Sequence, residues 1–265
     1  MPTVTSKDGT AIAYEISGDG TPLILVDGAM CYRDSGPMRP LAEALKDRFA
    51  VVTYDRRGRG QSSNTLPWSF DREIEDIEAL LAAVGGSAFV YGCSSGGALA
   101  LEAANRLPGI TKLIAYEIPY IVDASRDPMT DQKLAQLDAF VAAGRRGDSV
   151  KLFMRFVGVP GFVLFIMPFM GAWKKLTGIA HTLPYDLAMV GPYERGQPLP
   201  RDKWSGVRIP TLIMDGGKSP QWIRNAMKSL SAILPNARYR TLDGQTHMVV
   251  AARQAPVIKD FLAGA

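Results

Sequence analysis

The chain has 265 residues, of which 47% are hydrophobic and 21% are charged, and its formal net charge is +4. These values suit one globular unit with a large core, and the scattered basic residues argue against nucleic-acid binding. Cys31 and Cys93 are too few for a disulfide framework, and the N-terminus lacks a positive region followed by an apolar one. We therefore expect a cytoplasmic protein without a signal peptide.

Predicted strands and helices alternate along most of the chain. The strands are expected at residues 3–6, 10–16, 22–26, 49–54, 88–91, 110–116, 210–214 and 238–242. The helices are expected around residues 41–45, 70–84, 98–104 and 221–234 and at the C-terminus, with Ser69 as a cap of the second helix. The alternation predicts an α/β fold, in which helices cover both faces of a mostly parallel sheet.

The alternation stops in the middle of the chain. Residues 122–207 have few strand signals and are rich in methionine, phenylalanine and proline. We interpret them as a mostly helical cap inserted into a core formed by residues 1–121 and 208–265. Residues 156–173 of this cap are strongly apolar, but internal prolines disfavour a membrane span. They are expected to form the core of the cap, the lining of an apolar substrate pocket, or both.

The pattern Gly92-x-Ser94-x-Gly96 lies between a predicted strand and a predicted helix. A serine on so sharp a turn has strained backbone angles and close neighbours, which explains the two glycines. This context predicts a nucleophile elbow that exposes Ser94 at the N-terminus of a helix, where negative charge is favoured.

A serine nucleophile needs a base, and the chain has only two histidines. His247 follows the last predicted strand, which is the place of the base in folds where the serine comes first in the chain. His181 lies in the predicted cap, and we interpret it as a structural or substrate-facing residue.

Together, the elbow around Ser94, the turn at residues 55–62 and the place of His247 resemble the α/β-hydrolase family over almost the whole chain. Many members carry the catalytic acid in a Gly-x-x-Asp-Pro pattern after the next-to-last strand. Here the corresponding residues are Gly216 to Pro220, with Ser219 in place of the aspartate. Serine supplies no negative charge, so the acid is expected elsewhere.

Two other carboxylates are candidates for the acid. Glu117 ends the strand that follows the elbow helix, and a carboxylate that ends a buried strand needs a partner. Asp215 is the alternative, although an acid beside two glycines is typical of a turn. We favour Glu117, because its combination with Ser94 and with Val26-Asp27-Gly28 resembles the zearalenone lactonases.

The oxyanion hole is expected to use the backbone N–H of Ser95 and one N–H from the loop after residues 22–26. Resemblance to the lactonases implies Gly28, and the geometry of the wider family implies Ala29. The resulting hypothesis is a cofactor-free and metal-free serine hydrolase of an apolar carboxylic ester or lactone. C–C bond hydrolysis, a perhydrolase reaction and a hydrolase-like ligand receptor remain alternatives, because the same residues serve each of them. The oligomeric state is left open.

Overall fold

The computed structural model of the chain describes residues 2–264. Across these residues one sheet has the strand order β1-β2-β4-β3-β5-β6-β7-β8, antiparallel from β1 to β4 and parallel from β4 to β8. The strands are β1 (Thr3–Thr5), β2 (Ala11–Ser17), β3 (Thr21–Val26), β4 (Phe49–Tyr54), β5 (Ala88–Cys93), β6 (Ile110–Tyr116), β7 (Thr211–Gly216) and β8 (Ala237–Leu242). The predicted mostly parallel α/β sheet is confirmed.

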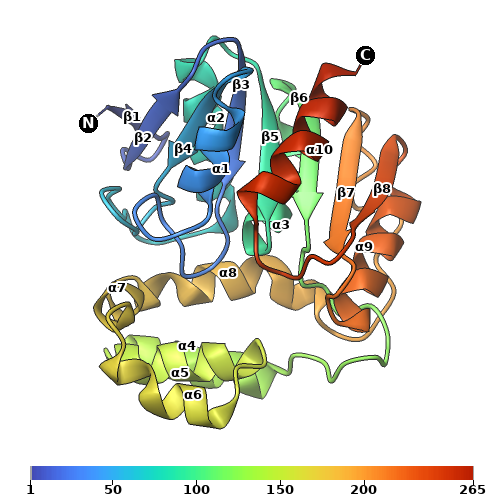
Figure 1. Cartoon of the computed structure of the whole chain (residues 1–265). Coiled ribbons are helices and arrows are strands. Elements are labelled where there is room, and N and C mark those ends of the chain that lie inside the picture. Colours follow the sequence, from blue (N-terminus) through green and yellow to red (C-terminus); the bar gives the residue numbers. More distant parts are fainter. Residues whose placement is uncertain (1, 265) are drawn as a thin grey trace.

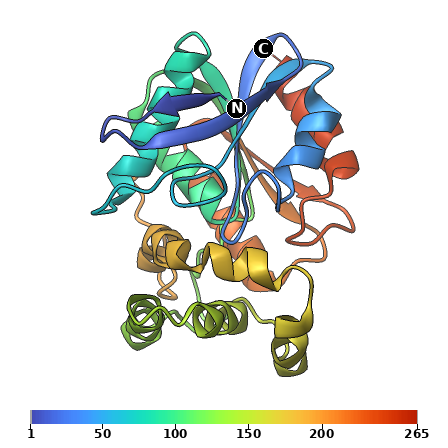
Figure 2. The same cartoon turned by 90° about the vertical axis from the view of Figure 1, so that its left-hand side faces the viewer.

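Helices cover both faces of the sheet (Figures 1 and 2). Helices α1 (Met38–Leu45) and α10 (Ala251–Ala263) pack on one face. Helices α2 (Phe70–Ala83), α3 (Ser95–Arg106) and α9 (Gln221–Ile233) pack on the other. Ser69 precedes α2 as predicted, but its side chain makes no capping hydrogen bond, so this part of the prediction is wrong.

The apolar sequence of β3 follows from its position between these two layers. Leu23 and Leu25 belong to the buried cluster on the α1 and α10 side. Ile24 and Val26 belong to the cluster on the α2, α3 and α9 side. Side chains alternate across a strand, so a strand that is covered on both faces has no position for a polar residue.

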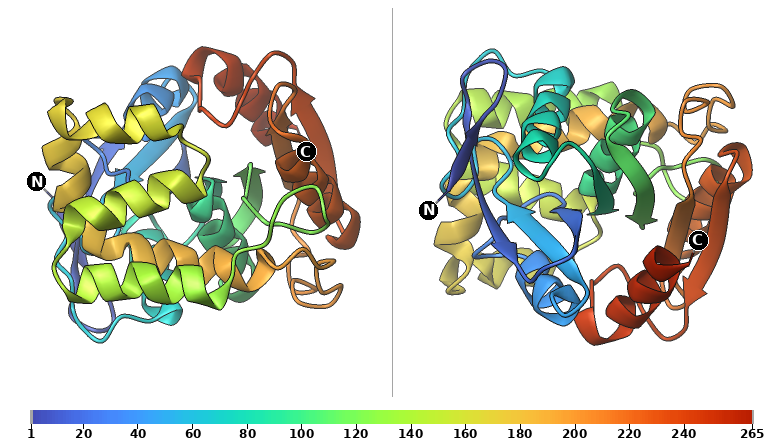
Figure 3. Two further views of the ribbon diagram at one scale, coloured as in Figure 1. Left: turned by 90° about the horizontal axis from the view of Figure 1, so that it is seen from below. Right: turned by 90° about the horizontal axis from the view of Figure 1, so that it is seen from above.

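Between β6 and β7 the chain forms helices and short 3₁₀ turns. The helices are α4 (Asp131–Ala142), α5 (Arg146–Phe156), α6 (Gly161–Ile166), α7 (Trp173–Gly178) and α8 (Leu183–Val190), and the 3₁₀ turns are η1 (Met167–Phe169), η2 (Ala180–Thr182) and η3 (Gly191–Tyr193). They lie across the carboxyl ends of the parallel strands, with α8 nearest to the sheet (Figures 1 and 3). This layer covers the edge at which Ser94 and Glu117 follow their strands.

The apolar residues 156–173 divide between the interior and the surface of this layer. Leu164 and Met167 are buried. In contrast, the side chains of Phe162, Phe165 and Phe169 are 72%, 76% and 85% exposed. The expectation that this stretch forms core or pocket lining is therefore wrong for its most exposed aromatic residues. Within residues 2–264, no helix is both long enough and apolar enough to cross a membrane.

Candidate active site

Ser94 occupies a strained turn between β5 and α3. Its φ of 55° and ψ of −132° lie where residues other than glycine are rarely found. A side chain at Gly92 would come within 2.4 Å of the carbonyl oxygen of Gly96. A side chain at Gly96 would meet the carbonyl oxygen of Asp27 at the same distance. The two glycines therefore allow the close backbone approach that pushes Ser94 out of the sheet.

Glu117 follows β6 and also has a positive φ, of 49°. Its side chain is fully buried, and its Oε2 atom lies 2.9 Å from Nδ1 of His247. The imidazole of His247 is 47% exposed and lines the same cavity as Ser94. The strained backbone thus directs the carboxylate of Glu117 to the histidine rather than into the core.

Ser219 has a partner that its sequence position did not predict. Its hydroxyl donates a hydrogen bond to Oε1 of Glu117, and the backbone N–H of Gly216 donates to the same oxygen over 2.6 Å. The residue that replaces the usual aspartate therefore holds Glu117 in place. Two donors on one oxygen fix the carboxylate and leave the other oxygen for His247.

The side chain of Asp215, the alternative acid, has partners other than His247. It is buried within β7, and its Oδ2 atom accepts a hydrogen bond from the hydroxyl of Tyr239. The same oxygen lies 3.6 Å from Nε of Arg224. No contact between Asp215 and His247 occurs among the described residues, so the geometry gives Asp215 a structural position beside β8.

The predicted oxyanion residues gather around Ser94. A side chain at Gly28 would come within 2.9 Å of Cβ of Ser94 and 3.5 Å of its Oγ. Ala29 and Ser95 line the cavity together with Ser94 and His247. Ser95 begins α3, so its backbone N–H has no acceptor inside the helix. The roles of Gly28, Ala29 and Ser95 stay predictions.

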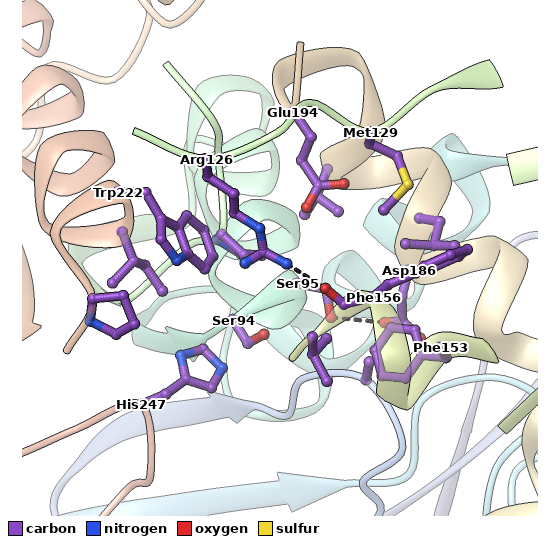
Figure 4. A pocket seen from close by; sticks show the side chains of 17 residues that line it. Ser94, Ser95, Arg126, Met129, Phe153, Phe156, Asp186, Glu194, Trp222 and His247 are labelled. Carbon is purple, nitrogen blue, oxygen red and sulfur yellow. Dashed lines mark hydrogen bonds between the residues drawn. The ribbon is translucent and has the colours of Figure 1, made fainter. Parts of the chain in front are cut away.

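One cavity of about 860 Å³, including its mouth, joins these groups to the cap (Figure 4). Most of its lining is apolar. The lining residues are Ala29, Ser94, Ser95, Pro119, Arg126, Met129, Phe153, Phe156, Val157, Asp186, Leu187, Val190, Glu194, Pro220, Trp222, Ile223 and His247. Of the apolar stretch at residues 156–173, only Phe156 and Val157 contribute. His181 is not among the lining residues; it lies on η2 beside Gly58.

A buried ionic network attaches α8 to the core. Asp186 lies 2.7 Å from Nη1 of Arg56 and 2.6 Å from Nη2 of Arg59. It also accepts a hydrogen bond of 2.8 Å from the hydroxyl of Ser95. The two arginines outweigh the desolvation of this fully buried carboxylate and hold its pKa below the usual range. The network thus connects the predicted oxyanion residue Ser95 to the cap.

Two other acids near the cavity have pKa values that are raised rather than lowered. Burial raises the pKa of Glu194 to about 7, and burial also raises the pKa of Asp27 to about 7. The sequence analysis did not identify Arg126, Asp186 or Glu194. Asp186 has one local signal, a charge within an apolar run, and the other two have none. Among residues 2–264, no cluster of His, Cys, Asp and Glu could hold a metal ion.

A mostly parallel sheet with a serine elbow after β5 and a histidine after β8 defines the class of this protein. The chain belongs to the alpha/beta hydrolase family, whose model matches residues 20–259. This match confirms the family that the sequence motifs predicted. The narrower resemblance to zearalenone lactonases stays a prediction.

The chain is also similar to individual proteins that are described as hydrolases. The crystal structure of an alpha/beta hydrolase from Sphaerobacter thermophilus is 47% identical, covers 98% of this chain and 100% of that one, and has a TM-score of 0.90. An uncharacterized hydrolase of Bacillus subtilis is 27% identical over 154 residues, which are 56% of this chain and 55% of the relative. A 3-oxoadipate enol-lactonase of Acinetobacter baylyi is 33% identical over 100 residues, or 37% of each chain. The chain thus spans about half or less of these two curated relatives, and the matches support a hydrolase.

Proposed function

We propose that the protein is a serine hydrolase that cleaves a carboxylic ester or lactone. Ser94 is the nucleophile, His247 is the general base and acid, and Glu117 orients His247. The backbone N–H groups of Ser95 and of Gly28 or Ala29 bind the oxyanion.

The reaction runs through an acyl-enzyme. His247 takes the proton of Ser94 Oγ as this oxygen bonds to the substrate carbonyl carbon, and the carbonyl oxygen becomes an oxyanion. The C–O bond to the leaving alcohol then breaks, and His247 returns the proton to that oxygen. A water molecule, deprotonated by His247, then attacks the acyl carbon. The bond from this carbon to Ser94 Oγ breaks, the acid product leaves, and His247 returns the proton to Ser94 Oγ. Glu117 stabilises the imidazolium that forms in each half of the reaction. No step in this sequence needs a metal or a cofactor.

The 2.9 Å contact between Glu117 Oε2 and His247 Nδ1 carries this proposal. It supplies the link between acid and base, while Ser94 and His247 line one cavity. A carboxylate on Nδ1 favours the tautomer in which Nε2 is free to accept a proton. The apolar walls of the cavity favour an apolar substrate, and the similarity to an enol-lactonase adds lactones to the class.

The direct test measures hydrolysis of p-nitrophenyl esters with acyl chains of graded length, together with a panel of lactones. We expect kcat/KM to rise from the acetate to the octanoate ester, because each buried methylene contributes up to about 0.8 kcal/mol. Ser94→Ala should lose nearly all activity and its labelling by a fluorophosphonate, as removal of a triad nucleophile costs several orders of magnitude in kcat.

The exposed Ser205 provides a matched control, since Ser205→Ala removes a hydroxyl outside the cavity. It should label and turn over like the wild type. Labelling of Ser94→Ala at the wild-type rate would exclude Ser94 as the nucleophile. If esters and lactones are bound without turnover, the chain is a ligand receptor. If a diketone or hydrogen peroxide is consumed instead, the C–C hydrolase or perhydrolase alternative replaces the proposal.

A further inference from the structure

The far part of the cavity holds a polar group that the proposed chemistry does not use. Glu194 is only 7% exposed, and its Oε2 atom is buried without a hydrogen-bond partner among the described residues. An unpaired buried carboxyl oxygen is costly, and native proteins normally satisfy such groups with a partner. Figure 4 shows the carboxyl of Glu194 pointing into the cavity. Glu194 also lines the cavity, so its carboxyl group faces a molecule that binds there.

Arg126 faces the same space. Its guanidinium lies 4.1 Å from the ring centre of Trp222, and its Nη2 donates to the backbone carbonyl of Phe156. Stacking and this hydrogen bond hold the side chain in place and leave other N–H groups available, because a guanidinium has five. Figure 4 shows the guanidinium directed into the cavity, as the carboxyl of Glu194 is. Arg126 and Glu194 form no ion pair with each other among the described residues.

The lining of a neighbouring cleft helps to place Arg126 and Glu194 relative to Ser94. That cleft is lined by Arg126, Met129, Phe156 and Glu194, which also line the catalytic cavity, and it lacks Ser94 and His247. The polar pair therefore borders both hollows, whereas Ser94 borders only the catalytic cavity. Apolar side chains, among them Phe153 and Leu187, line the catalytic cavity together with both polar groups.

We propose that Glu194 and Arg126 form a subsite that binds a hydroxyl group at the end of an otherwise apolar substrate. A hydroxyl donates its proton to the Glu194 carboxylate and accepts a hydrogen bond from the Arg126 guanidinium, so one neutral group satisfies both side chains. A second charge would have to be desolvated to enter the cavity, whereas a hydroxyl avoids this cost. This inference rests on the proposed function, since it assumes that the ester or lactone carbonyl lies at Ser94.

The test uses binding, so that it does not depend on turnover. Ser94→Ala is titrated calorimetrically with N-butyl amides of acids that have six to twelve carbons in the chain. For each length, the chain ends in a methyl, a hydroxyl or a carboxylate group. At the length that reaches the subsite, we expect the hydroxyl amide to bind at least tenfold tighter than the methyl amide, because hydrogen bonds to charged groups are strong.

The preference should vanish in Ser94→Ala/Glu194→Leu and shrink in Ser94→Ala/Glu194→Gln, whose amide keeps the shape of the side chain. Ser94→Ala/Asp127→Asn is the matched control, because Asp127 is exposed and lines only the neighbouring cleft. It should keep the full preference. Thermal melting checks that each variant is folded. If the Glu194→Leu variant does not fold, the Glu194→Gln variant provides the test.

Three results would overturn the proposal. Equal affinity for hydroxyl and methyl amides at every length means that water satisfies Glu194. Tighter binding of the carboxylate series means that the subsite binds anions. A hydroxyl preference that survives both Glu194 variants places the hydroxyl elsewhere. Failure of the proposed function is a separate result, namely wild-type protein that binds these amides but hydrolyses no ester or lactone.

Discussion

The carboxyl edge of the sheet and the cap meet at one cavity but are built differently. At the sheet edge, Ser94 and Glu117 directly follow strands β5 and β6, and both have positive φ angles. Neighbouring parallel strands and close-packed glycines hold these strained residues in place. Two of the three groups of the proposed chemistry thus stand directly at the ends of sheet strands, and His247 lies in the loop after β8.

The cap has no strand of its own among the described residues, and its segments are joined by isolated backbone hydrogen bonds and by side-chain contacts. Asp186 joins α8 to Arg56 and Arg59, and Arg126 and Glu194 come from segments at the two ends of the cap. The two regions therefore position their functional side chains in different ways. Backbone geometry at the sheet edge positions the reacting groups, whereas long-range side-chain contacts in the cap shape the substrate side.

The largest effect that tests this difference is expected at Glu117. Glu117→Gln should lower kcat by about 10²–10⁴ with little change in KM, because a neutral amide neither stabilises the imidazolium nor selects the right tautomer. Steady-state kinetics with a p-nitrophenyl ester measures both constants. Asp215→Asn is the matched acid-to-amide control on the adjacent strand, and it should have a mild effect. If Asp215→Asn is the crippling variant and Glu117→Gln is nearly normal, the acid has been misassigned.

The attachment of the cap is tested at Asp186. Asp186→Asn leaves the buried Arg59 without a counter-charge and leaves Arg56 paired with Glu73 alone. Removing one partner of a buried pair costs about 3–5 kcal/mol. Urea denaturation should show this loss in the free energy of unfolding. Asp148→Asn breaks the pair with Arg145 on the cap surface, where exposed pairs contribute about 0–1 kcal/mol. Equal losses for the two variants would contradict an ionic attachment through Asp186.

Glu194 should make the stability of the protein depend on pH. Its pKa is raised from 4.5 to about 7 in the folded protein, so the protonated carboxyl favours folding. This advantage is fully present below about pH 4.5 and is lost as the pH rises through 7. Glu194→Gln should therefore be more stable than the wild type at pH 8.5, by about 3 kcal/mol, with little difference at pH 4.5.

Urea denaturation of both proteins at the two pH values measures this difference. The exposed Asp127 gives a control, since Asp127→Asn should follow the wild type at each pH. A Glu194→Gln variant whose stability tracks that of the wild type from pH 4.5 to 8.5 would show that Glu194 titrates normally.

The smallest effect is expected at Phe165, and its neighbour Leu164 on α6 provides the comparison. Leu164 is 5% exposed and Phe165 is 76% exposed. Leu164→Ala should destabilise the protein by about 2–5 kcal/mol, because it leaves a cavity in the cap. Phe165→Ser should change stability by no more than about 0.5 kcal/mol. Thermal or urea unfolding distinguishes them, and a large loss for Phe165→Ser would mean that its side chain is covered in solution.

Local patterns in the sequence were enough to predict the fold and to propose the catalytic groups. Apolar runs such as residues 22–26 predict buried strands because a strand covered on both faces excludes polar side chains. The spacing Gly92-x-Ser94-x-Gly96 predicts the turn because only glycine permits that backbone approach. The missing aspartate at Ser219 directed attention to Glu117, whose carboxylate lies beside His247.

Other features depend on residues that are far apart in the chain. The hydroxyl of Ser219 reaches Glu117 across 102 positions, and Asp186 pairs with Arg56 across 130. Such contacts leave no local periodicity, so the sequence could not predict that Ser219 supports the acid or that Asp186 holds the cap.

The prediction for the apolar stretch at residues 156–173 is wrong only for its exposed aromatic residues, and the reason is the same. Its composition is uniform, but only the packing of α6 against the rest of the cap decides that Leu164 is buried and Phe165 is exposed. Likewise, Arg126 and Glu194 are ordinary charged residues until the cap folds over the sheet edge. By itself the sequence determined the backbone elements and the places of the proposed catalytic groups beside them, because these follow from short-range sterics and strand polarity. The tertiary structure alone decided which side chains of the cap face the substrate, since burial and pairing there are set by contacts between distant segments.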